Sequence, residues 1–271
     1  MNDFLTQRKL FGPLCAGIDP SAQTLIDLGF KNDSSGLESF TNEILEALKG
    51  KVGFIKPQVA FFERFGSAGF LVLERLISDA KAHGLYVIAD AKRGDIGSTM
   101  DAYGETWLSE ESPLSSNALT VSPFVGLGSL QSTIDLAAKQ QKTVFVLCST
   151  SNPDAAQFQS ALNDSKTVTK QIAEAALAYE FRPSTFGLVV GATRSLKSIG
   201  LEPSRLARVP ILAPGFGFQG AELSNGRTLF GAAWDSTVAS VSRSLVAEGI
   251  SVLPKTIDSH LLQIAQAERA G

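Results

Sequence analysis

The stretch Gly84-Leu-Tyr-Val-Ile-Ala-Asp-Ala-Lys-Arg-Gly-Asp95 predicts both a buried strand and a cluster of catalytic side chains at its end. Its apolar first half, residues 84–89, is typical of a buried strand. Asp90 and Lys92 follow at the end of this strand, on the same face, because side chains alternate between faces along a strand. Charged groups are seldom buried unless paired, so we expect an ion pair. With Asp95, this Asp-x-Lys-x-x-Asp array at a strand's carboxyl end indicates the site of a barrel enzyme.

Short apolar runs alternate with amphipathic segments along the rest of the chain. The expected strands are 14–18, 53–56, 86–90, 118–121, 143–147, 186–190, 211–213 and 238–241. The expected helices are 37–49, 68–83, 98–109, 127–139, 168–180, 194–199, a short segment near 221–223, and 259–269. Residues 32–36 and 152–164 are expected to be long loops. Eight strands alternating with helices favour a closed, parallel (β/α)8 TIM barrel of the α/β class, as a single domain over residues 1–271, rather than an open sheet.

Composition narrows the classes of function. Net charge is −3 with both signs dispersed, so we expect no nucleic-acid surface, although one basic pocket could serve an anionic small molecule. The N-terminus lacks the apolar core of a signal peptide, and no apolar stretch is long enough to span a bilayer.

Cys15 and Cys148 fall in expected strands, which predicts buried free thiols and a cytoplasmic location. Two histidines and two cysteines predict no metal cluster.

Polar and glycine-rich residues gather directly after the expected strands. In chain order these segments are Asp19-Pro20, Lys56-Pro57, Asp90-Ala-Lys92, Ser122-Pro123, residues 149–153, residues 191–193, residues 214–220 and Ser242-Arg243. In a barrel such segments converge on the rim formed by the carboxyl ends of the strands.

Several of these segments together resemble the orotidine 5′-phosphate decarboxylase family, and in particular its longer bacterial subgroup. They are Phe54-Ile-Lys-Pro-Gln-Val-Ala-Phe-Phe-Glu63, the Asp90-x-Lys92-x-x-Asp95-Ile96 array and Pro214-Gly-x-Gly-x-Gln219-Gly220, in family order. The similarity runs from Gly17 to about Arg243. It implies a cofactor-free enzyme that converts orotidine 5′-phosphate to UMP and CO2, a nucleotide as its small-molecule substrate, and a homodimer.

The chemistry of that reaction suits the charged array. Loss of CO2 leaves an electron pair at C6 in the plane of the pyrimidine ring, where no carbonyl can delocalise it. The enzyme must therefore stabilise the carbanion electrostatically and deliver a proton promptly, and Lys92 is the candidate for both. Asp90 would stand beside the departing carboxylate and fix the ammonium. Lys56 and Asp95 would extend an alternating chain of charges that keeps both lysines protonated.

The resemblance implies further roles at the rim. Asp19 matches a ligand of the ribose hydroxyls, and Lys56 would be shared between the ribose and the charges. Ser151 matches a serine that hydrogen-bonds the pyrimidine, with Ser149 and Thr150 close enough to be alternatives. Gln219 and Arg243 match the phosphate grip, for which bidentate donors and glycine-rich backbone N–H groups are suited. Two groups complete the implied set: Ile96 and Pro214 as substrate contacts, and Asp95 and Thr99 as residues that reach the neighbouring site of a dimer.

Structural alternatives exist for each of these residues. Asp90 and Lys92 could be a structural ion pair, and Asp95 could cap a helix that begins near Ile96. Lys56 and Arg243 could each be a solvated surface side chain. Similarly, Glu63-Arg64 is expected to be a surface pair and Phe61-Phe62 to be core, while Phe216 and Phe218 are bulkier than the residues expected beside the glycines of the seventh loop.

Two rival functions remain open. One is a metal-dependent sugar-phosphate decarboxylase or aldolase of the same structural group, which also uses an Asp-x-Lys-x-x-Asp array. Lys56 and the Gln219 loop favour the orotidine enzyme over it. The other is a barrel that binds a phosphate ligand without catalysis. The free-energy cost of burying four charged groups disfavours this function, because a binding protein would have no use for them.

Overall fold

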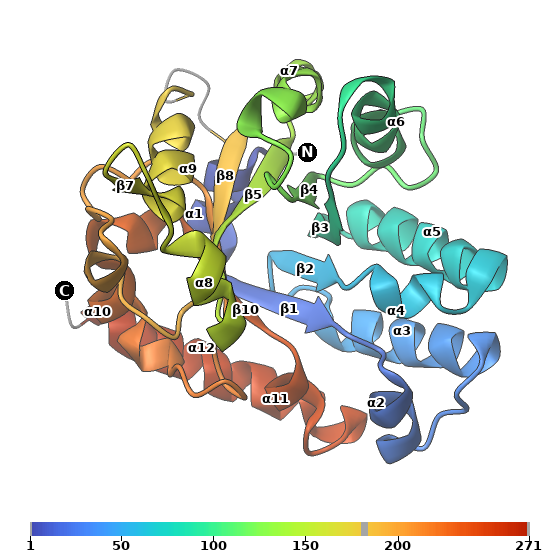
Figure 1. Cartoon of the computed structure of the whole chain (residues 1–271). Coiled ribbons are helices and arrows are strands. Elements are labelled where there is room, and N and C mark those ends of the chain that lie inside the picture. Colours follow the sequence, from blue (N-terminus) through green and yellow to red (C-terminus); the bar gives the residue numbers. More distant parts are fainter. Residues whose placement is uncertain (1, 180–183, 270–271) are drawn as a thin grey trace.

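A computed structural model describes residues 2–179 and 184–269 of the chain. Within these residues, eight parallel strands close into a barrel in the order β1-β10-β9-β8-β5-β4-β3-β2, with helices around it (Figure 1). The barrel strands are β1 (Leu14–Ile18), β2 (Phe54–Pro57), β3 (Tyr86–Arg93), β4 (Ala118–Val121), β5 (Thr143–Ser149), β8 (Phe186–Val190), β9 (Ile211–Pro214) and β10 (Thr237–Val241). The predicted (β/α)8 barrel and its eight strands are confirmed.

Helices of very different length connect the strands. They are α1 (Phe4–Phe11), α2 (Ala22–Asp27), α3 (Ser34–Leu48), α4 (Ala60–Glu63), α5 (Gly66–Ala82), α6 (Gly97–Leu108), α7 (Gln131–Lys139), α8 (Ala156–Gln159), α9 (Val168–Leu177), α10 (Gly226–Phe230), α11 (Arg243–Val246) and α12 (Leu253–Arg269). Around the barrel, α3 packs against α5 and α6 against α7. In the described part of the chain, no helix combines the length and apolarity needed to cross a membrane.

Four predictions about the connections are wrong. The segment predicted as helix 194–199 contains only a 3₁₀ turn, Lys197–Ile199, and the helix expected near 221–223 is a 3₁₀ turn at Leu223–Asn225. The loop predicted at 32–36 is already helical from Ser34, because the Asp33 carboxylate accepts the Gly36 N–H at 2.9 Å and caps α3. The loop predicted at 152–164 contains a 3₁₀ turn (Pro153–Ala155), α8 and the first strand of a small hairpin, β6 (Leu162–Asn163) with β7 (Lys166–Thr167).

Other helices also differ from the sequence pattern. The final helix begins at Leu253 rather than at residue 259. Helix α9 ends at Leu177, and Glu180, the predicted end, lies outside the described residues. Short helices α1 and α2 carry no long apolar period, and their signals are instead the N-caps Asp3 and Ser21, whose side chains accept backbone N–H groups.

The barrel interior changes character from one end to the other. At the amino end, Phe4 of α1 plugs the barrel and packs against Phe54, Tyr86 and Phe145, with ring centroids 5.3–5.8 Å apart. Cys15 belongs to the same buried cluster. At the carboxyl end, inward positions become polar, and the buried ones are Lys56, Asp90, Thr120 and Ser240. Because each strand alternates its side chains, the same inward face that packs the apolar core also delivers these polar groups.

Both cysteines are free and buried, as the sequence predicted. Burial raises the pKa of each thiol to about 12, because the apolar interior disfavours the thiolate. Neither thiol is therefore a nucleophile at neutral pH.

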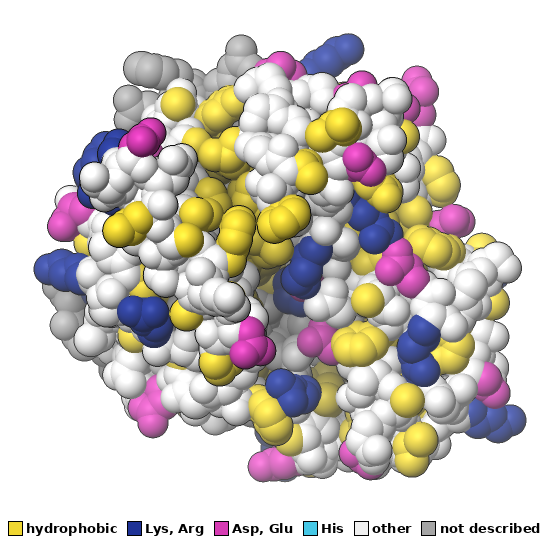
Figure 2. All heavy atoms as spheres, viewed as in Figure 1, with side chains coloured by type: hydrophobic (Ala, Val, Ile, Leu, Met, Phe, Trp, Pro, Cys, Tyr) yellow, Lys and Arg dark blue, Asp and Glu magenta, His cyan; other side chains and the backbone are white. Residues whose placement is uncertain are grey.

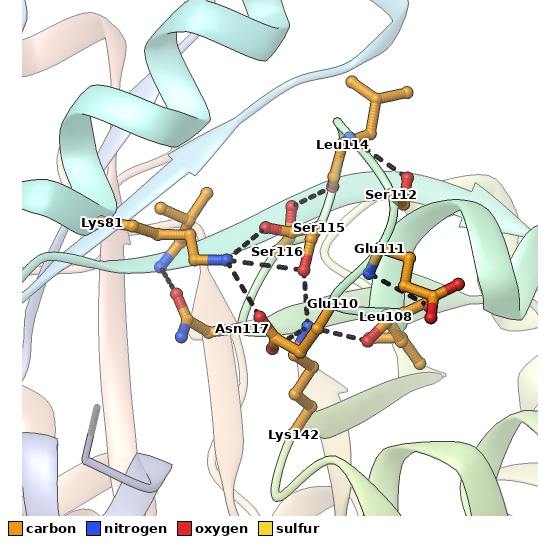
Figure 3. A network of polar contacts seen from close by, with 12 residues as sticks. Lys81, Leu108, Glu110, Glu111, Ser112, Leu114, Ser115, Ser116, Asn117 and Lys142 are labelled. Atoms are coloured by element: carbon orange, nitrogen blue, oxygen red, sulfur yellow. Dashed lines mark hydrogen bonds and ion pairs between the residues drawn. The ribbon is translucent and has the colours of Figure 1, made fainter.

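A cluster of charged side chains lies at the amino ends of β4 and β5 (Figure 3). Lys142 precedes β5 and its ammonium donates to Leu108 O and Ser115 Oγ, both at 2.7 Å, while Glu110 Oε1 lies 2.8 Å away. Lys81 donates to Ser115 O at 2.9 Å and lies 3.9 Å from Glu110 Oε2. These contacts tie the ends of α5 and α6 to the segments that enter β4 and β5.

Candidate active site

A cavity of about 540 Å³ opens at the carboxyl ends of the barrel strands. Figure 2 shows a hollow near the centre of this face, with Lys and Arg side chains at its edge. Eight of the predicted site residues line the cavity: Asp19, Lys56, Asp90, Lys92, Ser151, Pro214, Gln219 and Arg243. Residues from six different strands or their following loops thus converge on one space, as expected for a barrel of this kind.

A buried carboxylate between two ammonium groups forms the floor of the cavity. Asp90 Oδ2 lies 2.9 Å from the Nζ atom of Lys56, and Asp90 Oδ1 lies 2.6 Å from that of Lys92. Thr120 Oγ1 donates to Asp90 Oδ1 at 3.0 Å. Both Lys56 and Asp90 are buried, whereas the Lys92 side chain is 45% exposed and faces the cavity. Sequence reasoning missed Thr120, whose signal is a hydroxyl at an inward position of a buried strand.

The two lysines set the charge state of this cluster. Burial on its own would raise the pKa of Asp90, but the positive charges of Lys56 and Lys92 and their hydrogen bonds outweigh it and hold that pKa well below its usual range. Burial would lower the pKa of Lys56, and the carboxylates of Asp90 and Asp19 reverse this and raise it. Asp90 is therefore an anion and Lys56 a cation at neutral pH.

The Lys92 side chain points into the cavity because the backbone of β3 is irregular at this residue, and not because side chains alternate along a regular strand. Its φ is +48°, a left-handed conformation, and the register of β3 with β4 shifts between Ala89 and Arg93. The Lys92 N–H donates to Thr120 Oγ1 at 2.9 Å, which holds the irregular turn against β4. The predicted contact between Asp90 and Lys92 is confirmed, although its local geometry is a bulge.

Asp19 presents an unsatisfied oxygen to the same space. Its Oδ1 atom is buried and has no hydrogen-bond partner among the described residues, and the nearest cation, Lys56 Nζ, is 3.8 Å away. An unpaired buried carboxylate oxygen is costly unless a ligand supplies a donor. A sugar hydroxyl has the chemistry to supply it.

The part of the cavity wall that follows β9 and β10 is suited to an anion. Gln219 belongs to the glycine-rich loop after β9, and Arg243 begins α11 after β10. The Arg243 guanidinium makes no hydrogen bond or ion pair with any residue that the structure describes, so its donors remain for a ligand. Of the two bulky residues noted in the loop, Phe216 is buried against Phe230 and Trp234, and Phe218 is exposed beneath Arg243.

Three predicted site residues lie outside this cavity: Asp95, Ile96 and Thr99. Asp95 Oδ1 accepts only the adjacent Ile96 N–H, at 2.8 Å, and forms no ion pair within residues 2–179 and 184–269. The alternative that Asp95 caps a helix is wrong, because α6 begins at Gly97 after Ile96 and has no side-chain cap. Within one chain, the charged cluster therefore contains Lys56, Asp90 and Lys92 but not Asp95.

Two further predictions concern residues in or near the cavity, and their outcomes differ. Ser151 and Thr150 line the cavity and Ser149 does not, while Thr150 is engaged by Gln159, whose Oε1 accepts its N–H at 2.9 Å. The predicted surface pair Glu63-Arg64 is wrong. Glu63 instead forms an ion pair with Arg93.

The chain resembles known proteins of one family over most of its length. Residues 12–250 match the model of the orotidine 5′-phosphate decarboxylase / HUMPS family. An orotidine 5′-phosphate decarboxylase of Streptomyces coelicolor is 44% identical over 266 residues, covering 96% of this chain and 94% of that protein. The chain belongs to this family. A Nocardioides orotidine 5′-phosphate decarboxylase is 46% identical over 230 residues, covering 82% of each chain.

A solved structure extends this family likeness to three dimensions. The Streptomyces avermitilis structure assigned to the same activity has a TM-score of 0.90 and 42% identity, covering 97% of this chain and 94% of its own. Membership over nearly the whole barrel makes the family chemistry the first hypothesis for the cavity.

Proposed function

We propose that this chain decarboxylates orotidine 5′-phosphate to UMP and CO2 without a cofactor, and that Lys92 delivers the proton to C6. Family membership at 42–46% identity to orotidine 5′-phosphate decarboxylases supports the reaction. The position of Lys92 is the observation that supports its role as proton donor. Its ammonium contacts Asp90 at 2.6 Å while its side chain remains 45% exposed at the cavity.

The cavity offers polar groups to each part of the substrate. Arg243 and Gln219 hold the phosphate, Asp19 and Lys56 bind the ribose hydroxyls, and Ser151 hydrogen-bonds the pyrimidine. Pro214 lies beside the base at the end of β9. With the substrate so oriented, its carboxylate meets the floor of the cavity at Asp90 and Lys92.

The reaction at the floor of the cavity needs only the substrate, the side chains there and a proton from solvent. The bond between C6 and the carboxylate carbon breaks, its electron pair remains on C6, and CO2 leaves. The ammonium of Lys92 stabilises that pair and donates a proton to C6, becoming a neutral amine that solvent reprotonates. Asp90, held as an anion, orients the ammonium and disfavours the carboxylate of the bound substrate.

The metal-dependent sugar-phosphate enzymes of the same family are the second candidate. The position of Lys56 disfavours a metal-dependent enzyme. Its ammonium lies 2.9 Å from Asp90 and 3.8 Å from Asp19. A cation from the protein itself thus occupies the space between the two carboxylates that a divalent ion would need.

The active unit that we propose is a homodimer. Asp95 and Thr99 lie beyond their own cavity, and Ile96 is exposed between them, so all three are free to complete the site of a second copy. There, Asp95 would extend the Lys56-Asp90-Lys92 series to four alternating charges.

An absorbance assay tests the reaction directly. Purified protein is dialysed against EDTA and mixed with orotidine 5′-phosphate, and the loss of orotidylate absorbance is followed. We expect full activity in EDTA. If activity vanished in EDTA and returned with magnesium, the metal-dependent branch of the family would be the correct assignment. No turnover under either condition would leave a binding protein.

A further inference from the structure

The side chain of Phe218 lies face-on to the guanidinium of Arg243 at the rim of the cavity. The Cζ atom of Arg243 is 3.6 Å from the ring centroid, well inside the range of a cation–π contact. The phenyl ring is 67% exposed, so it contributes little to the core. Because the guanidinium has no hydrogen-bonded partner among the described residues, this ring is the contact that orients it.

The backbone fixes the ring in this place. Gly217 has a φ of +75°, and its N–H donates to Ala221 O at 2.8 Å, which closes a tight loop around Phe218. A Cβ on Gly217 would lie 2.3 Å from Ser244 Oγ, so the loop is packed directly against the start of α11. Arg243 is the first residue of α11, and ring and guanidinium therefore sit on two segments in close contact.

Stacking orients an arginine without consuming its donors. A carboxylate partner would occupy the in-plane N–H groups of the guanidinium, whereas an aromatic ring contacts only its flat face. The in-plane fork remains free to bind two oxygens of a phosphate.

We infer that Phe218 is a positioning residue for substrate binding, which holds Arg243 facing the cavity with its donors available to the phosphate. This inference rests on the proposed function for the identity of the ligand. The phenyl ring has no hydrogen-bonding group, so Phe218 acts on the phosphate through Arg243. Its presence explains why a bulky residue follows Gly217 in this loop.

Binding measurements on Phe218→Leu test the inference, because leucine keeps an apolar side chain and removes the aromatic face. By isothermal titration calorimetry, UMP should bind about two- to fivefold more weakly, and uridine, which lacks the phosphate, should bind as before. In turnover, KM should rise by the same factor while kcat stays constant. Phe218→Trp should restore wild-type affinity. Phe11→Leu, an exposed ring at the other end of the barrel, is the matched control and should change nothing.

The Arg243→Ala background decides whether the effect passes through Arg243. There, Phe218→Leu should cause no further loss, and an equal loss in both backgrounds would overturn the inference. Unchanged UMP affinity in Phe218→Leu, or an equal loss for uridine, would overturn it as well. Inorganic phosphate separates the two hypotheses. If the wild-type protein binds phosphate but not UMP, and Phe218→Leu weakens phosphate binding, the positioning role stands and the proposed substrate is wrong.

Discussion

Two clusters of lysines around a carboxylate lie at opposite ends of this barrel and differ in which member is buried. At the amino end, the buried member is Lys142, and all three of its ammonium partners, Leu108 O, Ser115 Oγ and Glu110, lie within 2.8 Å. At the carboxyl end, the buried carboxylate Asp90 lies between two lysines, and one of them, Lys92, is 45% exposed.

The two lysines differ in how many of their ammonium protons have a partner. The ammonium of Lys142 has three protons and three partners, so it has none to give. Burial is the largest influence on Lys142 and lowers its pKa, although Glu110 opposes this. The Lys92 ammonium contacts only Asp90 within the part of the chain that the structure describes, and its other protons face an open cavity. Similar residue types thus serve anchoring at one end and, in the proposed mechanism, proton delivery at the other.

The largest expected effect is on activity, from Lys92→Ala. Loss of the proton donor and of the charge beside C6 should reduce kcat by at least about 10³-fold. The variant should stay folded, because Lys56 and Thr120 still contact the buried Asp90 carboxylate. Decarboxylation assays and urea unfolding measure both quantities. A variant within tenfold of wild-type activity would refute the role of Lys92.

Mixed dimers test whether the carboxyl-end cluster is completed by a second chain. Asp95→Ala and Lys92→Ala should each be nearly inactive as homodimers. Refolded together at equal concentration, half of the dimers are mixed and carry one intact site of two, so roughly a quarter of wild-type activity should return. If mixed dimers are demonstrated by tag pull-down and activity does not recover, Asp95 does not act across an interface.

Lys56→Met should have the largest effect on stability. It leaves the Asp90 carboxylate buried with only Lys92 beside it, at a cost of about 3–5 kcal/mol in the free energy of unfolding. The depressed pKa of Asp90 contributes stability that is present above its unfolded pKa of about 3.9 and lost as pH falls through the folded value. The gap between wild type and variant should therefore stay constant from pH 7 to about pH 5 and shrink as the pH falls further. A gap that widened with acidity would contradict the charge assignment.

Lys142→Met is the matched substitution at the amino end, and its effect should be smaller. Leu108 O loses its side-chain donor and Ser115 Oγ keeps only the longer hydrogen bond from Lys81, which costs about 1–3 kcal/mol in the free energy of unfolding. The kcat value should equal that of wild type, because the cluster lies at the far end of the barrel from the cavity. A loss of kcat without a loss of stability would show that the two ends are not separate in function.

The sequence was sufficient for the barrel and for much of the site, for identifiable reasons. Buried parallel strands are continuous apolar runs, so β1, β4 and β8 could be predicted with their exact bounds. Asp90 and Lys92 are two residues apart, and their pairing is a local property of β3. The helices in the connections were less predictable, because α2 and α8 are too short for a period to develop.

What the sequence did not reveal depends on contacts between distant segments. The hydrogen bonds of Thr120 to Asp90 and to the Lys92 backbone join β4 to β3, and no local pattern encodes them. The contact between Phe218 and Arg243 likewise joins two loops that follow different strands. Sequence alone identified Phe218 only as bulkier than expected, and the fold shows that its ring contacts the Arg243 guanidinium.

Chemical reconstruction of the Lys92 ammonium tests proton delivery by this residue most directly. Lys92→Cys should be inactive, and alkylation of its Sγ atom with 2-bromoethylamine, which releases bromide, creates a side chain of lysine length that ends in an ammonium. Cys15 and Cys148 should not react, because burial raises the pKa of each to about 12. We predict that the aminoethylated protein regains at least about a tenth of wild-type activity, whereas alkylation with iodoacetamide, which adds no charge, restores none. Complete aminoethylation by mass spectrometry without any recovery would contradict proton delivery by Lys92.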